Sequence, residues 1–89
     1  MVTAFVLANT EGSHVSDIAD RLRTLDGVAE VHLVAGEYDI LAIARVGDNA
    51  ALSTLITGEI VHTPGVQRTK TLISMEGFQG PGCGQGAQS

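Results

Sequence analysis

The sequence predicts an α+β domain in which four strands form one antiparallel sheet and two helices cover one face of that sheet. Two segments of helical period lie between apolar segments typical of strands. The large core residues come mainly from Val, Ile and Leu, with no Trp, one Tyr and two Phe, and branched residues suit a pleated sheet. A chain of 89 residues is expected to form a single domain with a thin core.

The first half of the chain predicts a strand, a helix and a second strand. Residues 1–9 form a nearly continuous apolar run, which is typical of a buried strand. Residues 14–25 have helical spacing, with one apolar stripe made of Val15, Ile18, Ala19, Leu22 and Leu25. Residues 28–35 predict the second strand, whose apolar face is expected to carry Ala29, Val31, Leu33 and Ala35.

The second half predicts a strand, a helix and a last strand. Gly36 and Glu37 are expected to make a very short antiparallel turn into the strand 38–46. A helix over residues 50–61 follows, with Asp48 or Asn49 as its N-cap. Gly58 should weaken this helix by about 1 kcal/mol relative to Ala, so that its end frays or bends. Residues 66–75 alternate in the manner of a fourth strand.

This order of elements, β-α-β-β-α-β, is the ferredoxin-like plan. The strand 38–46 is apolar on both faces, with Leu41 and Ile43 on the face opposite Ile40 and Ala42. Because the helices cover only one face, the other is expected to pack on the same sheet of a second copy, giving an obligate homodimer. The domain should span residues 1–76, and the Gly-rich segment 77–89 should be a disordered tail.

Composition excludes several classes of function. The formal net charge is −5 and the five basic residues are dispersed, which argues against direct nucleic-acid binding. No apolar run approaches the ~20 residues of a membrane span, and no signal peptide is visible, so a cytoplasmic protein is expected. One cysteine, Cys83, excludes an intramolecular disulfide. The sequence predicts no catalytic residues, no cofactor and no metal site, since the three histidines lack ligand spacing: His14, His32 and His62.

Two motifs, together with the order of elements, resemble a known family. GEYDILAIARV, residues 36–46, has Gly, Tyr and Asp at the hairpin; PGVQRTKTLIS, residues 64–74, has two threonines two positions apart. Residues 2–75 resemble the effector-binding, or RAM, domain of the Lrp/AsnC feast/famine transcription regulators. The resemblance implies a cytoplasmic protein whose dimers form rings and bind small effectors, usually amino acids, between neighbouring dimers near the hairpin.

Full-length members of that family carry an N-terminal helix-turn-helix domain that binds DNA. Here Met1 already lies at the first strand, so we expect a stand-alone version of the effector-binding domain. Such a protein would bind an effector, or assemble with a full-length Lrp/AsnC regulator, without contacting DNA itself.

The candidate ligand-binding residues follow from the chemistry of a free amino acid. Asp39 can accept the ammonium group, while backbone N–H groups near Gly36 and the hydroxyls of Thr69 and Thr71 can donate to the carboxylate. Alternatively, Gly36 serves only the turn, Asp39 accepts backbone hydrogen bonds, and the threonines are ordinary strand residues. Two further candidates adjoin the turn: Glu37, which would select the ligand side chain or lie in solvent, and Tyr38, which would form a pocket wall or pack at an interface.

Two functions of different classes remain open on these grounds. The first is a non-catalytic sensor that binds an amino acid or related metabolite between subunits. The second is a small dimeric α+β-barrel enzyme of the monooxygenase type, which would need polar side chains in a cavity between helices and sheet. An ACT-like regulatory module and a purely architectural partner of full-length regulators are weaker alternatives.

Overall fold

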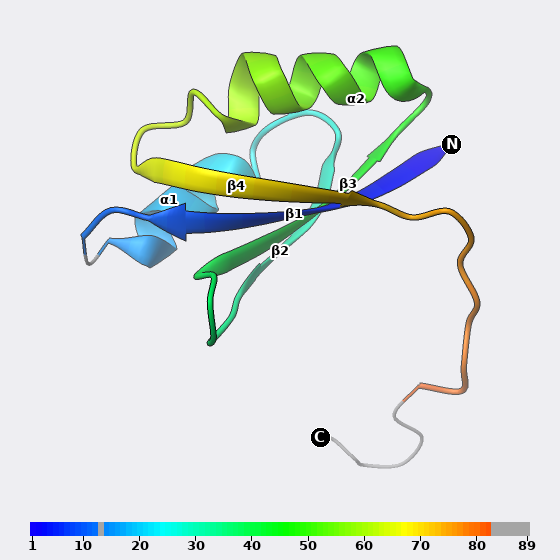
Figure 1. Ribbon diagram of the computed structural model, residues 1–89, viewed down its shortest axis with the longest axis horizontal. Coiled ribbons are helices and arrows are strands. Elements are labelled where there is room, and N and C mark those ends of the chain that lie inside the picture. Colours follow the sequence, from blue (N-terminus) through cyan, green and yellow to red (C-terminus); the bar gives the residue numbers. More distant parts are fainter. Residues whose placement is uncertain (13, 83–89) are drawn as a thin grey trace.

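The computed structural model describes residues 1–12 and 14–82, and these form the predicted α+β, ferredoxin-like fold (Figure 1). The elements are β1 (Val2–Thr10), α1 (Val15–Leu22), β2 (Val28–Leu33), β3 (Ile40–Val46), α2 (Asn49–Leu55), η1 (Ile56–Ile60) and β4 (Val66–Ile73). The sheet has the order β2-β3-β1-β4, and each neighbouring pair is antiparallel. The end of β1 and the starts of β3 and β4 are therefore brought together by pairing.

Both helices pack on the same face of the sheet. The inward side chains of the two central strands are small or β-branched and almost completely buried: Ala4, Val6, Ala8, Ile40, Ala42 and Ala44. Ile18 and Leu22 of α1, and Leu52, Leu55 and Ile60 of the second helical segment, complete this core. Small residues in the sheet let both helices approach closely, which is how a short chain reaches core density.

The first helix is shorter than its apolar stripe predicted. It ends at Leu22, and the chain continues in a tighter turn in which the N–H of Thr24 donates to Arg21 O and that of Leu25 to Leu22 O. Leu25 still packs against the core from this turn. The prediction over 14–25 was correct about burial but too long for the regular helix.

The assignment of faces in β2 was wrong at its start. Val28 pairs with Ala44, yet Glu30 pairs with Ile43, so the register shifts and Ala29 is an extra residue in the ladder. Val28 consequently packs against the core, while Ala29 is exposed. The strand also ends at Leu33 instead of Ala35. A bulge reverses the alternation of all residues on one side of it, and sequence periodicity alone does not reveal it.

The second helix changes from α-helical to π-helical geometry in the region of Gly58, where the sequence predicts a weakened end. α2 is regular to Leu55, and η1, which contains Gly58, is a π-helical segment in which the N–H of Val61 donates to Ile56 O at 3.0 Å. Such a segment widens the helix by one residue per turn. Gly58 has open space around its Cα, so the glycine is not required by packing.

Asp48 caps the second helix, as predicted for one of the two candidate residues. Its Oδ1 accepts a hydrogen bond from the N–H of Ala51 at 2.8 Å. Replacing Asp48 by Ala should lower the free energy of unfolding by about 1 kcal/mol, because this N–H loses its partner. The melting temperature should fall by about 4–8 °C. Asn49→Ala is the matched control and should change the melting temperature little; equal shifts in the two variants would contradict the capping role.

Candidate functional site

The segment between β2 and β3 is longer than the predicted two-residue turn. It runs over residues 34–39, so Tyr38 and Asp39 precede β3 and do not belong to it. The N–H of Val34 donates to Asp39 O at 2.9 Å and closes the segment, and Gly36 has φ 136°. Glycine reaches this conformation without the strain that a Cβ would cause. We call residues 34–39 the hairpin segment.

Asp39 fastens the hairpin segment to the end of β1. Its Oδ2 accepts hydrogen bonds from the N–H of Thr10 at 2.9 Å and from the hydroxyl of Thr10 at 3.3 Å. Its own N–H donates to Ala8 O at 3.0 Å. These contacts correspond to the structural alternative stated for Asp39, although its Oδ1 takes no part in them. A carboxylate has capacity for further donors on both oxygens.

Asn9 makes a second contact that holds the hairpin segment to β1, and the sequence analysis did not identify it. Its Nδ2 donates to the carbonyl oxygen of Glu37 at 2.7 Å, across 28 positions of sequence. Asn9 is the last residue of the predicted first strand, residues 1–9, and Thr10 follows it. Their polar side chains at the end of an otherwise apolar strand were the feature of the sequence that could have indicated a contact with the hairpin segment.

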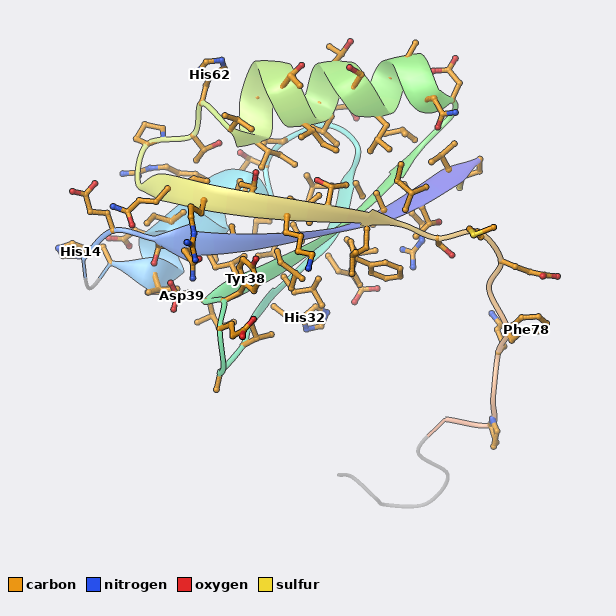
Figure 2. All side chains as sticks on the ribbon, viewed as in Figure 1. His14, His32, Tyr38, Asp39, His62 and Phe78 are labelled. Atoms are coloured by element: carbon orange, nitrogen blue, oxygen red, sulfur yellow. The ribbon has the colours of Figure 1, made fainter. Side chains whose placement is uncertain are left out.

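The remaining hairpin residues differ in exposure. Gly36 and Glu37 are exposed, whereas Tyr38 and Asp39 are half-buried. Tyr38 and Asp39 lie near one another at the end of the sheet where β1 finishes (Figure 2). The side chain of Glu37 therefore faces solvent in the single chain, whereas that of Tyr38 is partly covered by its surroundings.

The two threonines lie on a different strand from the hairpin segment. Thr69 pairs with Ala8 and Thr71 with Val6, so both are on the helix-covered face of β4 and are half-buried. Because β1 separates β4 from β3, the threonines lie about two strand spacings, roughly 10 Å, from the line of β3. The fold brings Thr69 to the same end of the sheet as the hairpin segment, while Thr71 lies further along β4.

Two surface depressions are lined by other residues. One, of about 430 Å³, lies between the start of β2, the end of β3 and α2, with Arg45 and Glu59 among its lining residues. The other, of about 310 Å³, lies at the start of α1 beside Pro64 and Gly65 and includes Glu11 and His14. None of the predicted ligand-binding residues lines either depression.

The histidines are far apart, as Figure 2 shows. Two of them have carboxylate neighbours: His14 Nδ1 is 3.7 Å from Asp17 Oδ2, and His32 Nε2 is 2.9 Å from Glu30 Oε1. No group of three or more His, Cys, Asp or Glu residues suited to a metal occurs in the described ranges. Cys83 and most of the predicted tail, residues 83–89, lie outside these ranges, and residues 77–82 are exposed without regular structure.

The centre of the sheet face opposite the helices is apolar, and Lys70 of β4 adjoins it beside Leu7. We define the open sheet face by the side chains that alternate with the core residues: Phe5, Leu7, Leu41, Ile43 and Leu72. Leu72 is 48% exposed, and the other four are half-buried in the single chain. Glu30, His32 and Arg45 form a polar border along the β2 side of this face.

Between the helices and the sheet, by contrast, the described core is almost wholly aliphatic. Thr63 is the one polar residue of the described chain that is buried there, and its hydroxyl donates to Glu59 O at 2.9 Å. No helix in residues 1–12 and 14–82 is long and apolar enough to cross a membrane.

Comparison with known proteins identifies the type of domain. The family model described as the Lrp/AsnC ligand binding domain matches residues 3–79. An uncharacterised helix-turn-helix-type transcriptional regulator of Pyrococcus furiosus is 33% identical over 75 residues, which are 81% of this chain and 50% of that protein. The chain therefore spans about half the length of that regulator. The family description is one of ligand binding, which confirms the predicted non-catalytic class.

Solved structures agree with this match. A crystal structure of a Thermus thermophilus protein is 37% identical, with a TM-score of 0.82, and the match covers 89% of this chain and 99% of that one. The structure of a feast or famine regulatory protein of Mycobacterium tuberculosis complexed with L-methionine is 29% identical with a TM-score of 0.76. That match covers 91% of this chain and 54% of the other.

Proposed function

Because the chain belongs to the Lrp/AsnC ligand-binding domain family, we propose that it is a non-catalytic sensor that binds an amino acid where subunits of an oligomer meet. One observation carries the proposal. The polar groups of the hairpin segment and Thr69 gather at one end of the sheet, yet they line neither of the two depressions described above. A small-molecule site usually buries most of its ligand, so a neighbouring subunit would supply the remaining walls.

The open sheet face supports the formation of a homodimer, which is the first level of assembly. Phe5, Leu7, Leu41 and Ile43 are contiguous across the two central strands, with Phe5 opposite Ile43 and Leu7 opposite Leu41. A contiguous apolar face of this kind is typical of an interface. The same face of a second copy, related by a twofold axis, would cover it and form a homodimer.

A second level of assembly would complete the ligand site. The hairpin segment lies at the end of the sheet, away from the centre of the open sheet face, so it is free to meet a hairpin segment from another dimer. Repetition of that contact would give a ring of dimers, or a mixed assembly with a full-length Lrp/AsnC regulator. The L-methionine complex of the Mycobacterium tuberculosis relative favours an amino acid as the ligand.

In the bound state the roles of the predicted residues are as follows. The free oxygen of Asp39 accepts from the ligand ammonium, and backbone N–H groups near Gly36 donate to its carboxylate. Tyr38 contributes apolar surface, and Glu37 meets the ligand side chain or the neighbouring subunit. Thr69 and Thr71 supply hydroxyl donors, Thr69 being the nearer to the hairpin end.

A thermal-shift screen of the twenty standard amino acids tests this function. We expect at least one to raise the melting temperature of the wild-type oligomer, since a ligand that binds only the folded state stabilises it. Asp39→Ala should weaken the binding of that amino acid by about 10- to 100-fold, because a hydrogen bond to a charged group is lost. Calorimetric titration measures the affinity directly.

Asp20→Ala is the matched control for that experiment. Asp20 is an exposed carboxylate on α1 that pairs with Arg23 Nε at 2.9 Å, far in sequence from the hairpin segment. The control should bind as the wild type does. If a well-folded oligomer bound none of the amino acids, this function would be ruled out.

The enzyme alternative has no observation in its favour. An α+β-barrel oxygenase would need convergent polar side chains between helices and sheet, and the described core there offers aliphatic groups and Thr63.

A further inference from the structure

The chain that follows β4 leaves the sheet and exposes apolar side chains. The N–H of Ser74 still donates to Thr3 O at 2.8 Å, but within the described ranges residues 75–82 form no backbone hydrogen bond to the sheet. Met75 is 99% exposed and Phe78 is 85% exposed. Four of the eight exposed large hydrophobic residues of the described chain lie between positions 72 and 78: Leu72, Ile73, Met75 and Phe78. We call residues 75–82 the exit arm.

The exit arm lies on the side of the sheet away from α2, as Figure 1 shows. This is the side of the open sheet face, because the side chain of His32, which borders that face, lies on the same side as Phe78 (Figure 2). A second copy covering the open sheet face would stand about 10 Å away, the usual spacing of stacked sheets. The exit arm in extended conformation spans up to about 26–29 Å, so it is long enough to contact that copy.

Opposite charges favour one alignment of the two open sheet faces. Lys70 adjoins the face on β4, and Glu30 borders it on β2. A twofold axis parallel to the strands would place β4 of each copy over β2 of the other and bring Lys70 near Glu30. One row of paired residues crosses the whole sheet: Val28, Ala44, Ala4 and Ile73. In this alignment the exit arm therefore begins beside the start of β2 in the second copy.

The start of β2 adjoins the depression of about 430 Å³ described above. Gly27, immediately before β2, lines it, as do three residues with apolar side chains: Val46, Ala51 and Leu55. Pockets for small molecules begin near about 300 Å³, so this depression has room for one aromatic side chain. Burial of a phenylalanine there would remove about 150–250 Å² of surface from water.

We propose that the exit arm of each copy crosses to the second copy of the dimer, where Phe78 packs in this depression and Met75 lies against the start of β2. The four residues from Ser74 to Phe78 span about 13 Å, and the aromatic side chain extends this distance. Because the twofold axis makes the exchange reciprocal, both depressions are filled in a closed dimer. The inference rests on the homodimer of the proposed function and does not depend on the amino-acid ligand.

Phe78→Trp tests the exchange directly, because the sequence contains no other tryptophan. Its fluorescence emission should lie at shorter wavelength in the dimer than in the folded Leu41→Lys monomer, since the indole leaves water only when a second copy is present. Ala51→Phe, which fills the depression, should return the emission of the dimer to the longer wavelength. Ser53→Phe adds the same ring at an exposed position of α2 outside the depression and should leave the emission unchanged.

Phe78→Ala makes the test independent of the larger size of tryptophan. The dissociation constant of the dimer should rise by about 10-fold or more, because a buried aromatic anchor is lost. Gln79→Ala is the matched control from the same arm and should dissociate as the wild type does. Sedimentation over a concentration series measures both constants.

The outcomes separate this inference from the proposed function. If the wild type is dimeric, Phe78→Ala and Gln79→Ala dissociate alike and the tryptophan of Phe78→Trp emits as in water, the inference is wrong while the proposed dimer and sensor stand. Short-wavelength emission that persists in the Leu41→Lys monomer would mean that the arm packs on its own chain, which also overturns the inference. A monomeric wild type would overturn the inference together with the proposed dimer.

Discussion

Leu41→Lys is expected to convert the proposed dimer into a folded monomer. Leu41 lies at the centre of the open sheet face, opposite Leu7 on β1 and His32 on β2. In the single chain a lysine there keeps its ammonium group in water, whereas in the dimer it would be buried without a partner. An uncompensated buried charge costs several kcal/mol, so the dissociation constant should rise by more than about 100-fold. Sedimentation equilibrium at low micromolar concentration measures the mass.

Ser53→Lys controls for the added charge. Ser53 is exposed on α2, on the opposite side of the molecule from the open sheet face, so this variant should remain dimeric. Ile43→Lys provides a second substitution on the face and should behave as Leu41→Lys does. A wild-type protein that sediments as a monomer, or a Leu41→Lys protein that stays dimeric, would be incompatible with the proposed interface.

Gly65→Ala should produce a large loss of stability. Gly65 has φ 96°, and an added Cβ would lie 2.5 Å from Cδ1 of Ile18, whose side chain is almost completely buried. Backbone strain costs about 1–3 kcal/mol, and forcing apart a packed core costs a similar amount. The free energy of unfolding should therefore fall by roughly 2–6 kcal/mol, and the melting temperature by more than about 10 °C.

Gly36→Ala separates the two causes. Gly36 also has a positive φ, but an added Cβ there would have no atom within 4 Å. It should show only the cost of the strained backbone, about 1–3 kcal/mol by thermal or denaturant unfolding. If both variants lost the same free energy of unfolding, the contact between residue 65 and Ile18 would not contribute to the destabilisation of Gly65→Ala.

Much of the fold could be predicted because periodicity and composition agree for most of the elements. The apolar stripe of the first helix and the continuous apolar character of β1 and β3 each point to one element type. The Pro-Gly pair at 64–65 marks the end of the second helical segment, and Asp48 marks its start. What periodicity could not predict is where a ladder gains a residue, since the bulge at Ala29 depends on how β2 meets β3.

The local geometry of the candidate site was only partly predictable, for a related reason. The hairpin motif identified residues 36–39, yet their local geometry depends on contacts with β1, which lies 28 and 29 positions away in sequence. Asn9 and Thr10 resemble ordinary polar residues at a strand end. Their role becomes visible only once the strand order places β1 beside β3, with Asp39 next to Thr10.

These contacts give the motif two distinct parts. Ile40–Val46 forms a central strand whose alternate side chains belong to the core and to the open sheet face. Residues 36–39 lie outside the strand and are held by side chains of β1. The hairpin segment is therefore attached directly to β1, one of the two central strands of the sheet.

A crystal structure of the oligomer grown with the amino acid that most raises its melting temperature tests the central claim most directly. The claim predicts ligand density between hairpin segments of neighbouring dimers, with the ammonium group within hydrogen-bonding distance of Asp39. Density confined to another place, such as the depression beside Arg45 and Glu59, would contradict it.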